Sequence, residues 1–137
     1  GNRLTDGEYA KGFFLEPTLF VDVDNDMRIA QEEIFGPVLA VIKFRDEAEV
    51  IRMANDSRYG LAGGVWTQDI NRALRVSRQI QAGTVWVNEF GPIPAGSAFG
   101  GYKDSGYGRE VHKQALDFYS QKKNIFISTN EVLDELY

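Results

Sequence analysis

The chain has 137 residues, 43% of them hydrophobic and 26% charged, which is ordinary for one soluble globular domain. It contains no cysteine and one histidine, His112, so disulfides, thiolate metal sites and histidine metal clusters are excluded. The formal net charge of -5 argues against a nucleic-acid partner and the lack of an apolar run of roughly 20 residues argues against a membrane span, so we expect a cytoplasmic protein.

The N-terminal part of the chain predicts extended structure interrupted by a short helix. Phe13–Val23 is rich in Phe, Leu, Thr and Val, but Pro17 restricts it to an edge or irregular segment. Met27–Glu33 predicts a short helix that ends before Gly36-Pro37, because the residue preceding a proline is pushed out of the helical region. Val38–Phe44 is apolar almost throughout, which predicts a core strand covered on both faces.

Two helices and a strand are predicted in the middle of the chain. Asp46, followed three residues later by Glu49, is typical of a capping box, so a helix is expected from there to about Asn55. Gly63–Trp66 predicts a strand. The next helix, Asp69–Gln81, is expected to carry one apolar side made of Ile70, Ala73, Leu74, Ser77 and Ile80.

The last third continues the alternation of strands and helices. Gly83 is placed to stop the preceding helix, and Thr84–Asn88 predicts another buried strand. A helix over Glu110–Ser120 and a final strand over Asn124–Thr129 follow. Strands alternating with helices of about 10 to 13 residues favour parallel pairing, so the expected fold class is α/β, a mostly parallel sheet with flanking helices.

The long irregular stretch Glu89–Gly108 is the first candidate site, since loops of this length in compact domains are usually functional. Its apolar residues Phe90, Ile93 and Phe99 either line a pocket or cover the core. Its glycines match neither a dinucleotide fingerprint nor a Walker motif, so no phosphate loop is predicted. His112, the sole candidate base for a serine nucleophile, stands in a charged context that favours a solvated surface residue.

Glu33 and Phe35 form a second candidate site. They are two residues apart, so in extended backbone both project to the same side, just before Gly36-Pro37. A carboxylate accepts hydrogen bonds from paired hydroxyls such as those of a ribose, and a phenyl ring offers a flat face to a heterocycle. The pair therefore suits a nucleotide, although an exposed glutamate and a buried phenylalanine are the commoner arrangement for this spacing.

Five blocks, read together, resemble the aldehyde dehydrogenase family in order and spacing over nearly the whole chain. They are Glu16-Pro17-Thr18, Glu32–Val38, Tyr59–Ala62, Gly83–Asn88 and Phe99–Glu110. The resemblance implies that residues 1–121 are the C-terminal part of a catalytic domain and residues 122–137 the terminal strand and tail of an assembly region.

In that family an aldehyde is oxidised to a carboxylic acid with NAD or NADP, through a cysteine nucleophile, hydride transfer and hydrolysis of a thioester. Because the chain has no cysteine, the resemblance implies a fragment without catalytic residues that is inactive alone. Its partners would be the aldehyde and, in a homo-oligomer, further copies of the chain. The alternative is a non-catalytic assembly or binding module with the same fold.

By the same resemblance, Glu33 would hold the nicotinamide ribose and Phe35 would pack beside the nicotinamide. If the alignment with the family were shifted by one residue, Glu32 would hold the ribose in place of Glu33. Phe99, and less securely Ile93, would face the aldehyde pocket. Ala98 stands at a position where proline is common in the family. This difference leaves the identity of the aldehyde open.

Overall fold

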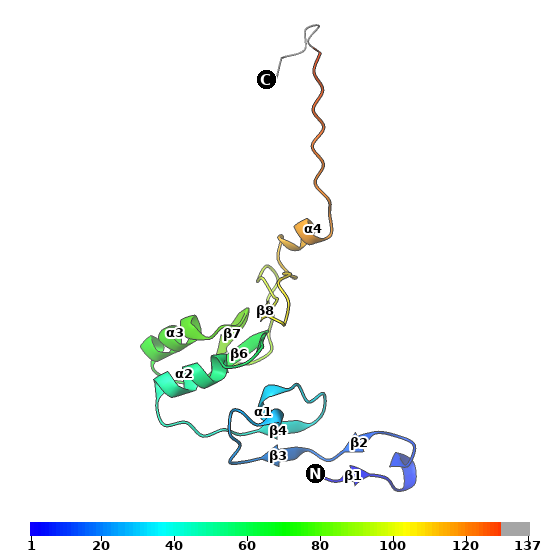
Figure 1. The fold of residues 1–137 in the computed structure, drawn as a ribbon, viewed down its shortest axis with the longest axis vertical. Helices are drawn as coiled ribbons and strands as arrows, with labels where there is room; N and C mark the ends of the chain where they lie inside the picture. The colour runs from blue at the N-terminus through cyan, green and yellow to red at the C-terminus, as the bar shows by residue number, and fades with distance from the viewer. Residues whose placement is uncertain (130–137) are drawn as a thin grey trace.

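The computed structural model describes residues 1–129, and it has the α/β architecture that the sequence predicts. Parallel strand pairs carry flanking helices, but they do not merge into one sheet: the described residues form four separate two-stranded ladders. Two of these ladders are parallel and two antiparallel. Figure 1 shows the elements spread along one long axis, from β1–β4 at one end to α4 and the following segment at the other.

The first parallel pair is a small β–α–β unit made of β3 (Thr18–Phe20), α1 (Arg28–Gln31) and β4 (Val38–Ala40). Thr18 lies opposite Val38 in this ladder. Pro17 lies between β2 and β3, so the segment Phe13–Val23 is irregular, as predicted, because proline cannot donate to a ladder. The crossover through α1 lets the two strands run in the same direction.

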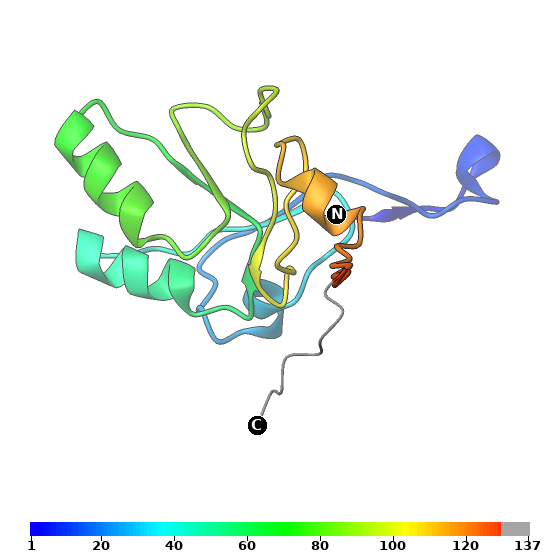
Figure 2. The same ribbon diagram turned by 90° about the horizontal axis from the view of Figure 1, so that it is seen from above.

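The second parallel pair is made of β6 (Ala62–Val65) and β7 (Thr84–Val87), connected through α3 (Ile70–Gln79). The helix α2 (Glu47–Asn55) lies beside α3, and Figure 2 shows the two helices next to each other. These bounds agree with the predicted strands and helices to within a few residues, because capping residues and the apolar pattern of each element mark its ends in the sequence.

Both longer helices begin at the predicted aspartates. The Asp46 carboxylate accepts a hydrogen bond from the Glu49 backbone N–H, 2.8 Å away. The Glu49 carboxylate accepts in return from the Arg45 backbone N–H at 2.7 Å, one residue earlier than in the usual capping box. Asp69 caps α3 by accepting from the backbone N–H groups of Asn71 and Arg72.

Two short antiparallel ladders were not predicted. The N-terminal ladder joins β1 (Arg3–Leu4) to β2 (Phe14–Leu15) around the 3-10 turn Gly7–Tyr9, and it projects from the rest of the chain in both views (Figures 1 and 2). The other joins β5 (Tyr59–Gly60) to β8 (Tyr102–Lys103), which lies within the long loop. Strands of two residues carry too little periodicity to be recognised in a sequence.

The C-terminal predictions are only partly met. The helix predicted over Glu110–Ser120 is reduced to the single turn α4 (Ala115–Phe118). The strand predicted over Asn124–Thr129 is not observed, because no ladder pairs it with another segment of the described part. Figure 1 shows this stretch extended away from α4. Residues 130–137 of the predicted tail lie outside the described residues.

The core is small, and three burial predictions are wrong; one of them is the buried strand predicted over Thr84–Asn88, since β7 has no buried residue. Among the described residues only three hydrophobic side chains are buried, namely Val23, Ala73 and Val76. The predicted double-sided cover of β4 is absent: Leu39 is 61% exposed, because no described element covers that side of the two-stranded ladder. The helix α3 turns Ala73 and Val76 toward β6 and β7, so Ile70 of its predicted apolar side is exposed. None of the helices in residues 1–129 is long and apolar enough to cross a membrane.

Candidate functional site

The candidate site of Glu33 and Phe35 is the loop of residues 32–37 between α1 and β4. Its backbone turns tightly: the Gly36 N–H donates to the Ile34 carbonyl and the Val38 N–H to the Gly36 carbonyl, both at 2.8 Å. The Pro37 carbonyl accepts from the Thr18 N–H at 2.8 Å, which ties the end of the loop to the start of β3. The loop is therefore anchored at its C-terminal end by the parallel ladder.

The two adjacent glutamates of this loop have different surroundings. The Glu32 carboxylate pairs with the Arg28 guanidinium one helical turn earlier, at 2.7 Å. The Glu33 side chain lines an open cleft of about 660 Å³ and accepts no hydrogen bond from any other described residue. Phe35 is 98% exposed. The structure thus leaves Glu33 and Phe35 available to a ligand, whereas Glu32 already has a cationic partner.

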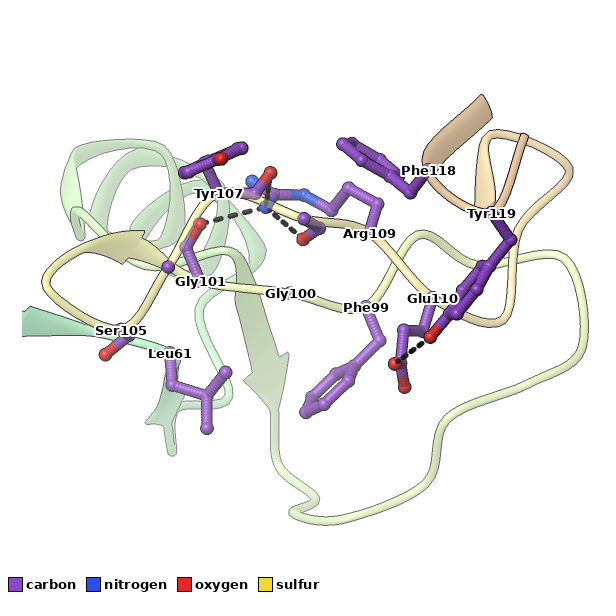
Figure 3. Close-up of a pocket in the computed structure, with 12 residues that line it drawn as sticks. Leu61, Phe99, Gly100, Gly101, Ser105, Tyr107, Arg109, Glu110, Phe118 and Tyr119 are labelled. Carbon is purple, nitrogen blue, oxygen red and sulfur yellow. Dashed lines mark hydrogen bonds between the residues drawn. The ribbon is translucent and has the colours of Figure 1, made fainter. Parts of the chain in front are cut away.

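The candidate site in the long loop is a pocket of about 420 Å³, built from residues 99–110 with contributions from Leu61, Phe118 and Tyr119. Figure 3 shows Phe99 and Glu110 side by side at its rim. Their backbones form an isolated antiparallel bridge, with N–H to O distances of 3.1 Å from Phe99 and 2.7 Å from Glu110. This bridge closes the ends of the loop and holds Phe99 in the pocket lining.

Arg109 holds the interior of the same loop. Its Nη1 donates to the carbonyl oxygens of Gly101 at 2.9 Å, Tyr107 at 3.1 Å and Gly108 at 2.8 Å. The guanidinium also lies 5.6 Å from the centroid of the Tyr102 ring. Figure 3 shows the side chain reaching along the loop toward Gly101. The cation is therefore engaged by backbone carbonyls of its own loop.

The polar residues at the tip of the loop contact residues 55–60. The Lys103 Nζ donates to the carbonyls of Asn55 at 2.7 Å and Ser57 at 2.9 Å. Asp104 pairs with Arg58 at 2.8 Å, and the Ser105 hydroxyl accepts from the Gly60 N–H at 3.0 Å. These side chains already have partners within the chain.

Gly83 has a role other than the predicted one. The helix α3 ends at Gln79, and Gly83 does not adopt the positive φ of a glycine helix stop. A Cβ atom at Gly83 would lie 1.6 Å from the carbonyl oxygen of Gly100, which is closer than any real contact. Glycine is needed here because the chain entering β7 touches the backbone of the pocket loop.

The remaining candidates lie elsewhere. Ile93 is 39% exposed and does not line the pocket that contains Phe99. The pocket of Phe99 and the cleft of Glu33 share no lining residue, so this chain does not unite the two predicted groups in one cavity. His112 Nδ1 accepts from the Gln114 N–H at 3.2 Å, a local turn contact. No cluster of three or more His, Cys, Asp or Glu side chains within residues 1–129 could hold a metal ion.

Comparison with known proteins identifies the family. The sequence pattern described as "Aldehyde dehydrogenase family" matches residues 1–125. The chain belongs to the aldehyde dehydrogenase family. It is similar to acetaldehyde dehydrogenase of Pseudomonas aeruginosa, with 54% identity over 123 residues, covering 90% of this chain and 24% of that protein.

Solved structures of aldehyde dehydrogenases share the fold. Betaine aldehyde dehydrogenase from Staphylococcus aureus in complex with NAD+ matches with a TM-score of 0.84 and 47% identity, over 96% of this chain and 26% of that one. Mycobacterium tuberculosis aldehyde dehydrogenase complexed with NAD+ matches with a TM-score of 0.80 and 46% identity, over 93% of this chain and 26% of that one. The chain thus spans about a quarter of the length of these aldehyde dehydrogenases.

Sequence reasoning missed three residues that hold the two loops of this aldehyde dehydrogenase chain. They are Gln31, Lys103 and Arg109, whose side chains donate to backbone carbonyls. Lys103 and Arg109 lie inside the block Phe99–Glu110 that resembles the family, and this resemblance is the sequence feature that could have identified them. Nothing near Gln31 in the sequence indicates its contact with the carbonyl of Asp56, which is 25 residues away.

Proposed function

We propose that the chain is the C-terminal part of an NAD(P)-dependent aldehyde dehydrogenase that oxidises an aldehyde to a carboxylic acid. Residues 1–121 would belong to the catalytic domain, and residues 122–137 to the terminal strand and tail of the assembly region. The observation that carries the proposal is the free carboxylate of Glu33 near an exposed Phe35, in a chain of the aldehyde dehydrogenase family. Similar structures of this family are described in complex with NAD+.

Glu33 and Phe35 fit such a cofactor chemically. The Glu33 carboxylate has unused acceptor positions, which can receive the two hydroxyls of the nicotinamide ribose. Phe35 exposes its whole ring, which can pack beside the nicotinamide. The bound cofactor supplies hydride acceptance, and these two residues bind and orient it.

The aldehyde side of the proposal rests on Phe99. This residue is half-buried in the pocket lining, and the bridge to Glu110 limits its movement. An apolar ring at this position would pack against the aldehyde carbon chain and exclude water. Ile93, in the neighbouring loop, would complete that surface in the whole enzyme, together with segments that this chain does not include.

The chain would not catalyse the reaction alone, because it has no cysteine to serve as the nucleophile. The test is aldehyde-dependent reduction of NAD by the complete protein and by the isolated chain. The complete protein is expected to be active and the isolated chain inactive. Turnover by the isolated chain, or none by a complete protein with a cysteine, would contradict the proposal.

Substitution of the two glutamates tests the cofactor role. Glu33→Gln in the complete protein is expected to raise the KM for NAD by about tenfold, since hydrogen bonds to a charged group contribute about 1.5–3 kcal/mol. The matched control is Glu32→Gln, whose carboxylate faces Arg28 and which should change this KM by less than about twofold. A larger effect of Glu32→Gln would reverse the assignment.

One observation favours the alternative of a non-catalytic assembly module that forms homo-oligomers. Ile125, Phe126 and Ile127 are 72%, 87% and 77% exposed in a stretch with no ladder to the rest of the described chain. An extended apolar segment of this kind can add to the sheet edge of another chain. A native reading frame that continues upstream into a cysteine-containing segment would favour the dehydrogenase, and one that begins at Gly1 would favour the module.

A further inference from the structure

Three successive backbone carbonyls at the C-terminal end of α2 accept hydrogen bonds from Gln31, at the end of α1, and from Lys103, in the loop of residues 99–110. The carbonyls of Asn55 and Ser57 accept from Lys103 Nζ at 2.7 and 2.9 Å. The carbonyl of Asp56, between them, accepts from Gln31 Nε2 at 3.0 Å. The last carbonyls of a helix lack partners within the helix, so this turn offers free acceptors. We define residues 55–57 as the carbonyl turn.

Gln31 connects the carbonyl turn to the loop of residues 32–37. It is the last residue of α1 and stands two residues before Glu33. Its Nε2 also donates to the Asn25 carbonyl, and the Asn25 side chain donates to the Asp56 carboxylate at 3.1 Å. A helix of four residues has little stability of its own, so these contacts hold the start of the loop.

Lys103 connects the carbonyl turn to the loop of residues 99–110. It lies in β8, opposite Tyr59, four residues after Phe99. A cation near the end of a helix is favoured both by the free carbonyls and by the negative end of the helix dipole. Its backbone φ of +52° is unusual for a residue with a side chain, and the two hydrogen bonds hold it there.

The carbonyl turn is itself tied to the rest of the fold. The Asn55 side chain donates to the Gln79 carbonyl and accepts from the Gln81 N–H, both at 2.8 Å. The Asp56 N–H donates to the Arg52 carbonyl at 2.9 Å. The turn is therefore fixed against the ends of both α2 and α3, which makes it a firm attachment for the two loops.

We propose that the carbonyl turn is a common support that sets the position of Glu33 relative to Phe99, with Gln31 and Lys103 as positioning residues. The inference deepens the proposed function, on which it rests for the roles of Glu33 and Phe99. Glu33 and Phe99 line separate cavities, so an indirect link through a shared support is needed to align them. Gln31 and Lys103 act on Glu33 and Phe99 through the carbonyl turn and not through contact with the ligand.

Hydrogen exchange of the complete protein, without cofactor or substrate, tests the support independently of catalysis. Gln31→Met and Lys103→Met keep the length of each side chain but remove the donor. Gln31→Met should raise amide exchange in residues 32–38 by about tenfold, and Lys103→Met should do so in residues 99–110 and also in 32–38. The matched controls are Gln68→Met and Lys43→Met, at exposed side chains that do not contact the carbonyl turn.

Lys103→Arg keeps a donor and should restore near-native exchange. Exchange in α3 serves as an internal control, because its interior is not attached to either side chain. A rise confined to the loops supports the proposal, whereas a rise that includes α3, or no rise beyond that of the controls, would overturn it. Lys103→Met without effect on residues 32–38 would also overturn it, since the two loops would then be held separately.

Binding of NAD gives a second readout. Calorimetry should show an affinity about tenfold weaker for Gln31→Met and near-native for Gln68→Met. An unchanged affinity for Gln31→Met would overturn the positioning role. If the native protein bound no NAD and reduced none with any aldehyde, the proposed function would fail, while the exchange result would still decide whether the carbonyl turn supports both loops.

Discussion

Glu32 and Glu33 are adjacent and chemically identical, yet only one of them is free. Both glutamates line the same cleft, but Arg28 lies one helical turn before Glu32 and occupies its carboxylate, whereas Glu33 follows the end of the helix and has no such cationic partner among the described residues. Arg109 shows the opposite situation, since its Nη1 donates to three carbonyls of its own loop. The residue type alone therefore does not show which charged group is available to a ligand.

The close approach of Gly83 to Gly100 leads to a prediction at the residue scale. Gly83→Ala places a methyl group against the Gly100 carbonyl, so the pocket loop must move, and we expect a loss of about 1–3 kcal/mol in the free energy of unfolding. Urea unfolding would measure it. Gly36→Ala is the control, because a Cβ there meets no atom within 4 Å and the stability should change little. Equal stability of the two variants would contradict the packing argument.

At the scale of elements, the start of α2 depends on a short network of charged side chains. The Arg45 side chain, hydrogen-bonded to the Glu49 carboxylate, lowers the pKa of Glu49 from 4.5 to about 2. Farther along the surface, hydrogen bonds from Arg75 lower the pKa of Glu47, which joins α2 to α3. The two helices are thus joined by the ion pairs of Glu47 with Arg72 and Arg75.

The lowered pKa of Glu49 predicts how stability depends on pH. Because the carboxylate form is favoured in the folded state, its contribution is present above pH 4.5 and is lost as the pH falls through that value to about 2. Glu49→Gln should therefore reduce the difference between urea midpoints at about pH 6 and about pH 3. Glu8→Gln, at an exposed side chain, should leave that difference unchanged. An unaltered pH dependence in Glu49→Gln would contradict the assignment.

At the scale of the whole molecule, the chain exposes more apolar surface than an independent domain normally does. Leu19 and Leu39, paired in register on the β3–β4 ladder, are 59% and 61% exposed. Figure 1 shows how the elements extend along one axis instead of enclosing a shared core. This agrees with a chain that covers about a quarter of the length of similar aldehyde dehydrogenases.

We accordingly expect the isolated chain to self-associate. Sedimentation velocity at increasing protein concentration should show a rising average mass, because burial of the exposed apolar side chains removes them from water. Introducing charge with Leu19→Lys and Leu39→Lys should lower that mass. Strictly monomeric behaviour of the native chain at high concentration would contradict the expectation.

The sequence by itself determined the family, the α/β class and the starts of the helices at Asp46 and Asp69. These features depend on patterns and contacts within a few residues, such as the hydrogen bond from the Glu49 N–H to Asp46. Only the tertiary structure decided that Gly83 meets Gly100, that Gln31 and Lys103 share the carbonyl turn, and that β4 is uncovered. Those outcomes depend on contacts between residues distant in the chain, and on which neighbouring segments are present to cover a face.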